Sequence, residues 1–319
     1  MAPSSFRSDW LRRVSLSRPA SRLNADPSLR AGWPNATDGL RRAVQLASTG
    51  FDRIAPARSG LSFLIYHRVG ARTDSGVDLD TDQFRAQMEA LATGGHVISI
   101  GEAVERLGRS DRGGSTAATQ QDQSRAVVIT FDDGTADWSD IVLPILCEYS
   151  LPAVFYAATA FVEDQRPFPG DAHPISWAGL RALVDSGLAT IGSHTHTHPM
   201  FDRLEPKAAA EELDRSIGLL QDRLGVAVDH FAYPRAVRGR PAVEAEVRAR
   251  FSSAVLAGGR SNQWNSCDRY RLSRAPVHRR DSPDVVASKA SGGLRLEGTL
   301  REMLDRVRYG LDRRPATMR

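Results

Sequence analysis

From residue 61 onward, short apolar segments alternate with segments of helical periodicity, and this alternation restricts the possible folds more than any other feature. The apolar segments are rich in Val, Ile, Phe and Tyr and carry few charges, as expected for strands buried on both faces. We expect strands at 61–66, 96–99, 126–131, 153–157, 189–191, 230–233, 253–256 and 272–277. Helices are expected to begin near Thr81, Ser176, Pro206 and Pro241. The order predicts an α/β barrel or a doubly wound sheet.

The segment before this alternation has a different composition. Residues 1–60 contain ten Arg and four Asp, whereas the rest of the 319 residues contain 32 basic and 34 acidic residues. We therefore divide the chain into a basic extension at 1–58, with a helix possible at 38–54, and a folded domain at 59–319. A basic segment can contact nucleic acid or an anionic membrane surface. No aromatic residues are interleaved in the pattern of nucleic-acid-binding segments, so we favour a solvated extension and expect no nucleic acid partner.

No apolar run reaches the roughly 18–20 residues that span a bilayer, and the arginine-rich start does not read as a signal peptide. We therefore expect a cytoplasmic protein, with at most weak membrane-surface contact through the basic extension.

The two cysteines, Cys147 and Cys267, are too far apart for a C-x-x-C pair. Cys147 follows several aliphatic residues and is expected to be buried. Polar residues at 108–124 and proline-rich residues at 163–175 predict two long loops.

Two adjacent carboxylates end one predicted strand. The sequence Thr130-Phe131-Asp132-Asp133-Gly134 follows a run of Val and Ile, and in an α/β barrel reactive groups lie where strands end. Two neighbouring aspartates repel each other unless a cation or a proton lies between them. An ordinary Asp-Asp-Gly turn is an equally simple interpretation of this motif alone.

Three of the eight histidines fall within five residues, in the run Gly192-Ser193-His194-Thr195-His196-Thr197-His198-Pro199. Pro199 and the β-branched threonines disfavour a helix here, so the run is expected to continue from a strand end into a loop. Neutral imidazoles together with a carboxylate suit zinc or a similar first-row metal. The histidine run therefore predicts a metal site.

Together, the two motifs resemble those of the NodB-type polysaccharide deacetylases, the fourth carbohydrate esterase family. The resemblance covers roughly residues 60–290. Further similar segments are Leu64-Ile65-Tyr66-His67-Arg68-Val69, Ser176-Trp177, Phe231-Ala232-Tyr233-Pro234 and the strand from Arg274 to Val277. The resemblance implies a distorted (β/α)7-type barrel and removal of N-acetyl groups from an acetamido sugar in a poly- or oligosaccharide.

The resemblance also implies roles for individual residues. Asp132 would be the general base, and Asp133, His194 and His198 would bind one divalent metal ion, with Zn²⁺ favoured over Co²⁺, Ni²⁺ or Fe²⁺. His196 occupies the variable position between the ligands and has no assigned role. A late L-x-H motif, which supplies the general acid in many members, is absent. His67 is the preferred substitute, with His278 as the competitor.

The third motif departs from the family pattern. It reads Phe231-Ala232-Tyr233-Pro234-Arg235-Ala236, so Ala232 stands where the family has an arginine that orients the base. Arg274 is the candidate to supply that charge from another strand. The resemblance implies that a backbone N–H in this segment contributes an oxyanion hole, so Tyr233 and Arg235 are candidates for oxyanion or substrate contacts.

Two alternatives stay open. The altered third motif is compatible with a non-catalytic carbohydrate-binding relative, although such a protein would not need Asp132. An aspartyl phosphotransferase would not explain the histidine run. For either sugar-binding hypothesis, Trp138, Trp177, Tyr233 and Trp264 are candidate stacking surfaces. Core packing is the competing interpretation and is favoured for Trp177.

Overall fold

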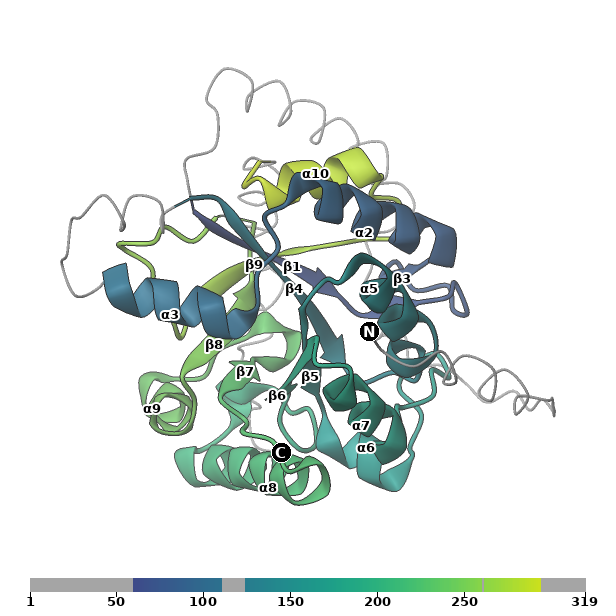
Figure 1. Ribbon diagram of the computed structural model, residues 1–319. Helices are drawn as coiled ribbons and strands as arrows, with labels where there is room; N and C mark the ends of the chain where they lie inside the picture. Colours follow the sequence, from purple (N-terminus) through teal and green to yellow (C-terminus); the bar gives the residue numbers. More distant parts are fainter. Residues whose placement is uncertain (1–59, 111–123, 260, 294–319) are drawn as a thin grey trace, which may run out of the picture. The chain divides into compact units, whose positions relative to one another are not determined.

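A closed barrel of parallel strands forms the centre of the computed structural model (Figure 1), which describes residues 60–110, 124–259 and 261–293. Its seven strands follow one another around the ring in the order of the sequence. They are β1 (Leu61–Tyr66), β4 (Ala126–Asp133), β5 (Ala153–Ala157), β6 (Ala189–Ser193), β7 (His230–Ala232), β8 (Ser253–Ala257) and β9 (Leu272–Pro276). Of the two α/β architectures that the alternation allowed, the structure has the barrel. A separate short ribbon pairs β2 (Arg68–Val69) with β3 (Asp78–Leu79).

Helices connect most of the strands and cover the outside of the barrel (Figure 1). The α-helices are α2 (Thr81–Gly94), α3 (Ile100–Ser110), α5 (Leu143–Tyr149), α6 (Thr159–Asp164), α7 (Trp177–Asp185), α8 (Pro206–Leu224), α9 (Pro241–Arg250) and α10 (Pro283–Ala290). Short π and 3₁₀ turns are η4 (Trp138–Val142), η5 (Phe201–Arg203) and η6 (Pro234–Ala236). The Ser176 side chain caps α7 as predicted, whereas α2 is capped by Asp80, one residue before Thr81.

Strand pairing is uneven around the ring, which makes the barrel irregular. β1 and β4 pair over six residues, but β6 and β7 share a single residue pair, Ser193 with Phe231. The ring closes through two pairs between β1 and β9, and the second of these involves Pro276, which has no N–H to donate. The distorted (β/α)7-type barrel implied by the family resemblance is confirmed.

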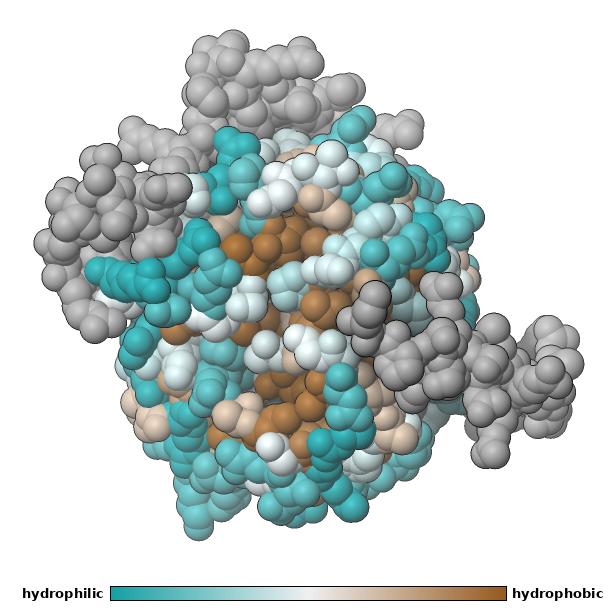
Figure 2. All heavy atoms as spheres, in the orientation of Figure 1, coloured by the Kyte–Doolittle hydropathy of each residue, from teal (hydrophilic) through white to brown (hydrophobic). Residues whose placement is uncertain are grey.

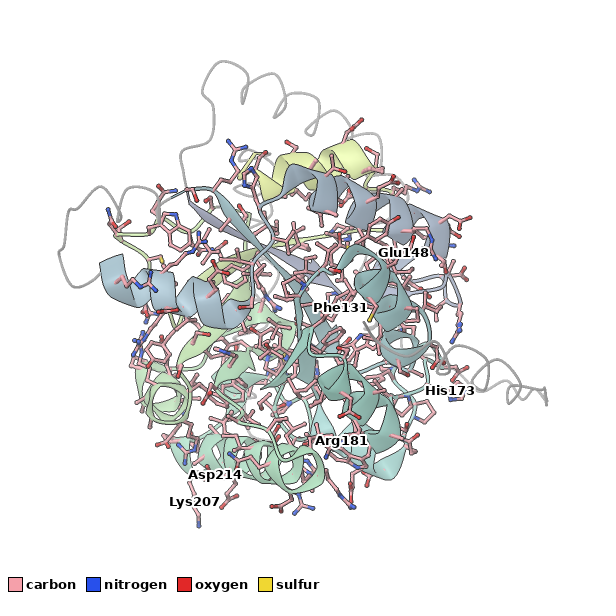
Figure 3. The ribbon with its side chains drawn as sticks, in the orientation of Figure 1. Phe131, Glu148, His173, Arg181, Lys207 and Asp214 are labelled. Carbon is pink, nitrogen blue, oxygen red and sulfur yellow. The ribbon has the colours of Figure 1, made fainter. Side chains whose placement is uncertain are left out.

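The strands bury both faces, as their composition predicted. One apolar cluster fills the barrel interior and includes Phe63, Val128 and Tyr156. A larger cluster lies between strands and helices and includes Phe131, whose ring stacks on Phe155 with centroids 4.9 Å apart. Figure 3 shows Phe131 in the interior and Lys207 projecting outward from α8. On the face shown in Figure 2, hydrophilic residues cover most of the rim and apolar residues gather near the centre.

Two sequence-based expectations were wrong. Residues 96–99 do not form a barrel strand, because only Val97 forms a bridge, to Val127, before α3 begins. Cys147 is exposed rather than buried. It follows Ile145 and Leu146 on α5, and the helical rotation that buries those two residues turns the next one toward solvent.

The basic extension at 1–58, including the expected helix at 38–54, lies outside the described residues, as does most of the expected loop at 108–124. The expected loop at 163–175 runs from the end of α6 to the start of α7. In the described part of the chain, no helix combines the length and apolar character needed to cross a membrane.

Candidate active site

The two aspartates end β4 on opposite sides of the strand. Side chains alternate along a strand, so Asp132 shares the inward face with Val128 and Thr130, whereas Asp133 belongs to the other face. The backbone of Asp133 has a φ of 84°, and Gly134 follows with a φ of 115°. A positive φ is unusual for an aspartate, and such backbone strain is often found at functional sites.

Asp132 forms a buried ion pair with Arg274 of β9. Both carboxylate oxygens accept hydrogen bonds from the guanidinium at 2.6 Å, which is a bidentate arrangement. Arg274 also donates to Thr130 Oγ1 at 3.0 Å and to the Leu256 carbonyl at 3.2 Å. Burial raises the pKa of Asp132, but the charge and the hydrogen bonds of Arg274 outweigh burial, so the net pKa lies below its usual value. Arg274 therefore occupies the position that the sequence analysis suggested for the missing arginine.

The predicted metal ligands Asp133, His194 and His198 lie together. Asp133 Oδ1 is 3.6 Å from Nε2 of each histidine, and the three ligand atoms all lie within 4.8 Å of one another. His194 comes from the end of β6 and is almost fully buried, while the side chains of Asp133 and His198 are each 21% exposed. This partial exposure leaves an open side from which a substrate can approach.

These three side chains fit a divalent metal ion. Ligand atoms that lie 2.0–2.2 Å from one zinc ion are separated from each other by roughly 3.3 Å. The observed 3.6 Å separations are close to this spacing and are long for hydrogen bonds. The Nδ1 atom of His194 lies 2.8 Å from the Ala232 carbonyl, so Nδ1 donates and Nε2 keeps its lone pair for a metal. Burial lowers the pKa of His198 to about 4, which keeps that imidazole neutral.

His67 follows β1 and lies in the electrostatic field of the same site. The pKa of His67 lies below its usual value, mainly because the ring is buried. The charges of Asp133 and Asp132 oppose this shift, and the charge of Arg274 adds to it. Its Nδ1 atom is buried without a hydrogen-bond partner among the described residues, and a buried unpaired polar atom is costly. The competitor, His278, lies beyond β9, where its backbone N–H donates to Asp281 at 2.9 Å.

The third-motif segment corrects one expectation. Tyr233 is fully buried among Phe201 and Phe231, and its backbone N–H donates to Val255, so neither its ring nor its amide can contact a substrate. Arg235 is exposed and has a φ of 54°. The next two amides, at 236 and 237, donate within the turn, whereas no backbone acceptor in the described chain takes the Arg235 N–H. Of the two predicted residues, only Arg235 keeps a free donor, and its charge helps to lower the pKa of His198.

His196, which had no predicted role, does not join the candidate metal ligands. Its Nδ1 lies 2.9 Å from Thr159 Oγ1, and its Nε2 accepts a hydrogen bond from Arg215 Nε at 2.8 Å. Both ring nitrogens are therefore occupied. Arg215 and its neighbour Glu212 on α8 were not predicted, because helical periodicity does not show which strand-end loop a helix contacts.

The aromatic residues proposed as stacking surfaces lie mostly in the core. Trp138 is fully buried and Trp264 is 4% exposed, so, like Tyr233, they offer no face to a sugar ring. Trp177 is partly buried against the core, in agreement with the core-packing interpretation that was favoured for it. Its indole N–H donates to Glu163 at 2.7 Å.

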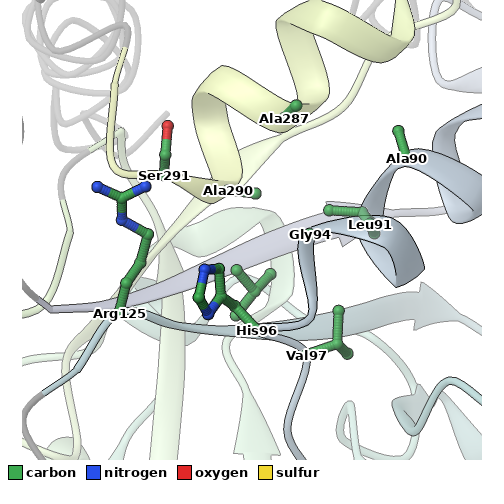
Figure 4. Close-up of a pocket in the computed structure, with 10 residues that line it drawn as sticks. Ala90, Leu91, Gly94, His96, Val97, Arg125, Ala287, Ala290 and Ser291 are labelled. Carbon is green, nitrogen blue, oxygen red and sulfur yellow. The ribbon is translucent and has the colours of Figure 1, made fainter.

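A pocket of about 220 Å³ lies at the opposite end of the barrel (Figure 4). It is formed where β4 begins and where α2 and α10 end. Its lining residues are Ala90, Leu91, Gly94, His96, Val97, Arg125, Val127, Ala287, Ala290 and Ser291. None of them is a carboxylate, and none belongs to the two motifs, so this pocket is separate from the candidate active site.

Comparison with known proteins shows similarity to one family over part of the chain. The family profile described as polysaccharide deacetylase matches residues 119–252, which include both motifs. Over this stretch the chain is similar to the polysaccharide deacetylases. It is 26% identical over 118 residues to a chitooligosaccharide deacetylase from Rhizobium leguminosarum bv. phaseoli. That match covers 36% of this chain and 44% of the relative, so the chain spans less than half the length of that curated protein.

Solved structures share the fold. IcaB from Ammonifex degensii is 26% identical with a TM-score of 0.61, and the match covers 74% of this chain and 98% of IcaB. The deacetylase PplD from Streptococcus pyogenes, solved in complex with acetate, is 19% identical with a TM-score of 0.61. That match covers 72% of this chain and 98% of PplD. These similarities support the deacetylase-type barrel as the common fold.

Proposed function

We propose that this chain is a metal-dependent hydrolase that removes N-acetyl groups from an acetamido sugar in a poly- or oligosaccharide. The observation that carries the proposal is the joint arrangement of the Asp133, His194 and His198 cluster with Asp132. The cluster supplies three ligand atoms with metal spacing, and the adjacent carboxylate is held ionised by Arg274. A carbohydrate-binding protein without catalysis would have no use for a base oriented in this way.

Asp133, His194 and His198 would hold the metal. The chemistry supplied by a bound Zn²⁺, or by Co²⁺, Ni²⁺ or Fe²⁺ in its place, is polarisation of the acetamide carbonyl and a lowered pKa for water. Metal dependence and metal identity are both part of the proposal. The donor set of two neutral imidazoles and one carboxylate favours zinc among these ions.

Asp132 would act as the general base. As water adds to the acetamide carbon, the carboxylate takes one proton from it. Arg274 limits the rotation of this carboxylate and keeps it ionised before the reaction. The same ion pair makes Asp132 a weaker proton acceptor, because it lowers the pKa of the carboxylate.

Arg235 and His67 would complete the reaction. The free backbone N–H of Arg235 would donate to the oxyanion that forms at the former carbonyl oxygen. The carbon–nitrogen bond then breaks, and His67 would give a proton to the departing amine. The products are acetate and a free amino sugar. A substrate nitrogen beside His67 would also satisfy a buried ring that has no partner at Nδ1.

Several finer assignments belong to the same proposal. The similarity to polysaccharide deacetylases and to the Rhizobium relative named for chitooligosaccharides supports the proposed substrate class. A cytoplasmic location and the division into an extension at 1–58 and a domain at 59–319 stay predictions, as does weak contact of the extension with a membrane surface. We expect no nucleic acid partner.

The proposal is tested by acetate release from a panel of N-acetylated oligosaccharides. We expect release by the full chain with Zn²⁺ or Co²⁺, loss with a chelator, and recovery when the metal is restored. Asp133→Ala should abolish both metal binding and release. Full activity in Asp133→Ala would reject the metal assignment. Stoichiometric metal binding without acetate release from any substrate would favour the non-catalytic alternative.

A further inference from the structure

The loop that carries the candidate metal ligands has an unfavourable backbone. Thr195 and His198 have φ angles of 68° and 62°, in the left-handed region that side chains other than glycine rarely adopt. The local sequence contains no glycine between residues 193 and 198 that could relax the turn. Contacts from outside the loop are therefore needed to keep this conformation.

Glu212 on α8 supplies such contacts. One carboxylate oxygen, Oε2, accepts hydrogen bonds from the backbone N–H groups of His196 at 3.0 Å and Thr197 at 2.7 Å. The other, Oε1, accepts from Thr197 Oγ1 at 2.7 Å. All three donors lie between His194 and His198 in the sequence, so this side chain holds the segment that joins the two ligands.

Two further residues on the same face of α8 contact the loop, one at its middle and one at its start. Arg215 donates to His196 Nε2 at 2.8 Å. Ser216 accepts from Ser193 Oγ at 2.8 Å, and Ser193 Oγ accepts from the Thr195 N–H at 3.1 Å. Residues three and four apart lie on one side of a helix, so Glu212, Arg215 and Ser216 form one contact surface. Glu212 is the member that binds the backbone between the ligands.

We propose that Glu212 is a positioning residue for the metal centre. Its carboxylate fixes the backbone at 196–197, and this orients the imidazoles of His194 and His198 toward Asp133. The inference rests on the proposed function, because it assumes that these three side chains bind a metal. It predicts that Glu212 controls metal affinity although it contributes no ligand atom.

A role limited to folding is the competing explanation. α8 already has an apolar buried face that includes Leu213 and Leu220, so it does not need Glu212 in order to pack. A contact that serves only folding would change the melting temperature and leave the metal affinity of the folded chain unchanged. The two explanations therefore differ in a measurable quantity.

The test is Zn²⁺ affinity measured on the full chain by competition with a chromophoric chelator. Glu212→Ala should weaken Zn²⁺ binding about 10–100-fold, the usual effect of losing a partner that orients metal ligands. Glu212→Gln should fall between wild type and Glu212→Ala, because an amide keeps one oxygen acceptor but adds N–H groups facing the loop. Glu211→Ala is the matched control, since Glu211 is exposed on the same helix and its carboxylate pairs with Lys207 of that helix, at 4.0 Å. It should change affinity less than twofold.

A second readout does not depend on metal. Amide hydrogen exchange at His196 and Thr197 in the metal-free chain should be faster in Glu212→Ala than in Glu211→Ala. Equal Zn²⁺ affinity in the two alanine variants would overturn the inference, and Glu212→Gln keeps the test valid if Glu212→Ala does not fold. A wild-type chain that binds no Zn²⁺ would overturn both the inference and the metal assignment. Glu212-dependent Zn²⁺ binding without acetate release would reject only the proposed activity.

Discussion

The buried pair of Asp132 and Arg274 links stability to catalysis at the scale of single residues. Arg274 is 1% exposed, so its removal would leave the Asp132 carboxylate buried without a counter-charge. Arg274→Met should destabilise the fold by about 3–5 kcal/mol, the usual cost of breaking a buried ion pair on one side. It should also raise the pKa of Asp132 and reduce kcat. Chemical denaturation and acetate release measure the two effects.

The double variant Arg274→Met/Asp132→Asn provides the control for this prediction. It removes both charges, so we expect it to be more stable than Arg274→Met alone while staying inactive. A double variant no more stable than Arg274→Met would contradict the view that an uncompensated carboxylate causes the loss.

The site residues that the sequence could predict are those in short linear motifs. Asp132, Asp133, His194 and His198 each lie within a few residues of another motif member, at the end of a recognisable strand. Arg274 was suggested because the family arginine is replaced by Ala232. Arg274 and its partner Asp132 are 142 positions apart in the sequence. The role predicted for Tyr233 was wrong because strand alternation and the local turn, rather than residue type, decide which side chains of the third motif face the candidate active site. The sequence did not indicate a role for Glu212, since any solvent-exposed helix face carries charged residues of this kind.

At the scale of elements, two glycines should respond to the same substitution in opposite ways. A Cβ at Gly192, on β6, would lie 2.5 Å from the Tyr156 ring and 2.8 Å from the His230 carbonyl oxygen. Gly192→Ala should therefore destabilise the fold by about 1–3 kcal/mol through overpacking between β5 and β7. Thermal denaturation, with the metal absent, measures the change.

Gly218 provides the matched control on α8. A Cβ there would meet no atom within 4 Å, and alanine favours the helix more than glycine does. Gly218→Ala should stabilise the fold by up to about 1 kcal/mol. Equal effects of the two substitutions would mean that the close packing of β6 against Tyr156 does not limit this part of the barrel.

Element prediction succeeded where periodicity and caps agreed. α7 and α8 begin where Ser176 and Pro206 indicated, and the seven barrel strands were all expected. The strand predicted at 96–99 did not form, because a four-residue segment with two aliphatic side chains does not show whether a neighbouring strand has a free edge. Here β4 already pairs with β1 and β5, so Val97 finds only one bridge position.

At the scale of the whole molecule, Asp137 should make stability depend on pH. Burial raises its pKa to about 6, although its carboxylate accepts a hydrogen bond from the Val69 N–H at 2.8 Å. The folded state then binds a proton more tightly than the unfolded state. Stability should fall as pH rises from about 4 to about 6 and should stay at the lower level above that range.

Asp137→Asn should remove this loss, because the amide oxygen still accepts from Val69 and carries no charge. At pH 7 the variant should be more stable than wild type by up to about 3 kcal/mol, the value that corresponds to a shift of about two pKa units. Urea denaturation between pH 4 and pH 8 is the measurement. A variant with the same pH dependence as wild type would show that Asp137 does not titrate in this range.

Metal binding should stabilise the whole barrel, because the three proposed ligands come from the end of β4 and from the loop that follows β6. At a Zn²⁺ concentration 100-fold above the dissociation constant, the gain should be about 2.7 kcal/mol. A rise in melting temperature with Zn²⁺ should occur in wild type and be absent in His194→Ala. An equal rise in that variant would place the ion elsewhere.

The central claim is that Asp132 performs catalysis beside a metal that other residues hold. The most direct test compares acetate release from an N-acetylated oligosaccharide by wild type and by Asp132→Asn, each loaded with Zn²⁺ and each assayed for bound metal. We predict one Zn²⁺ per chain in both proteins and a loss of about 10²–10⁴-fold in kcat for Asp132→Asn, the usual contribution of a general base. Unchanged kcat in a metal-loaded Asp132→Asn would contradict the account.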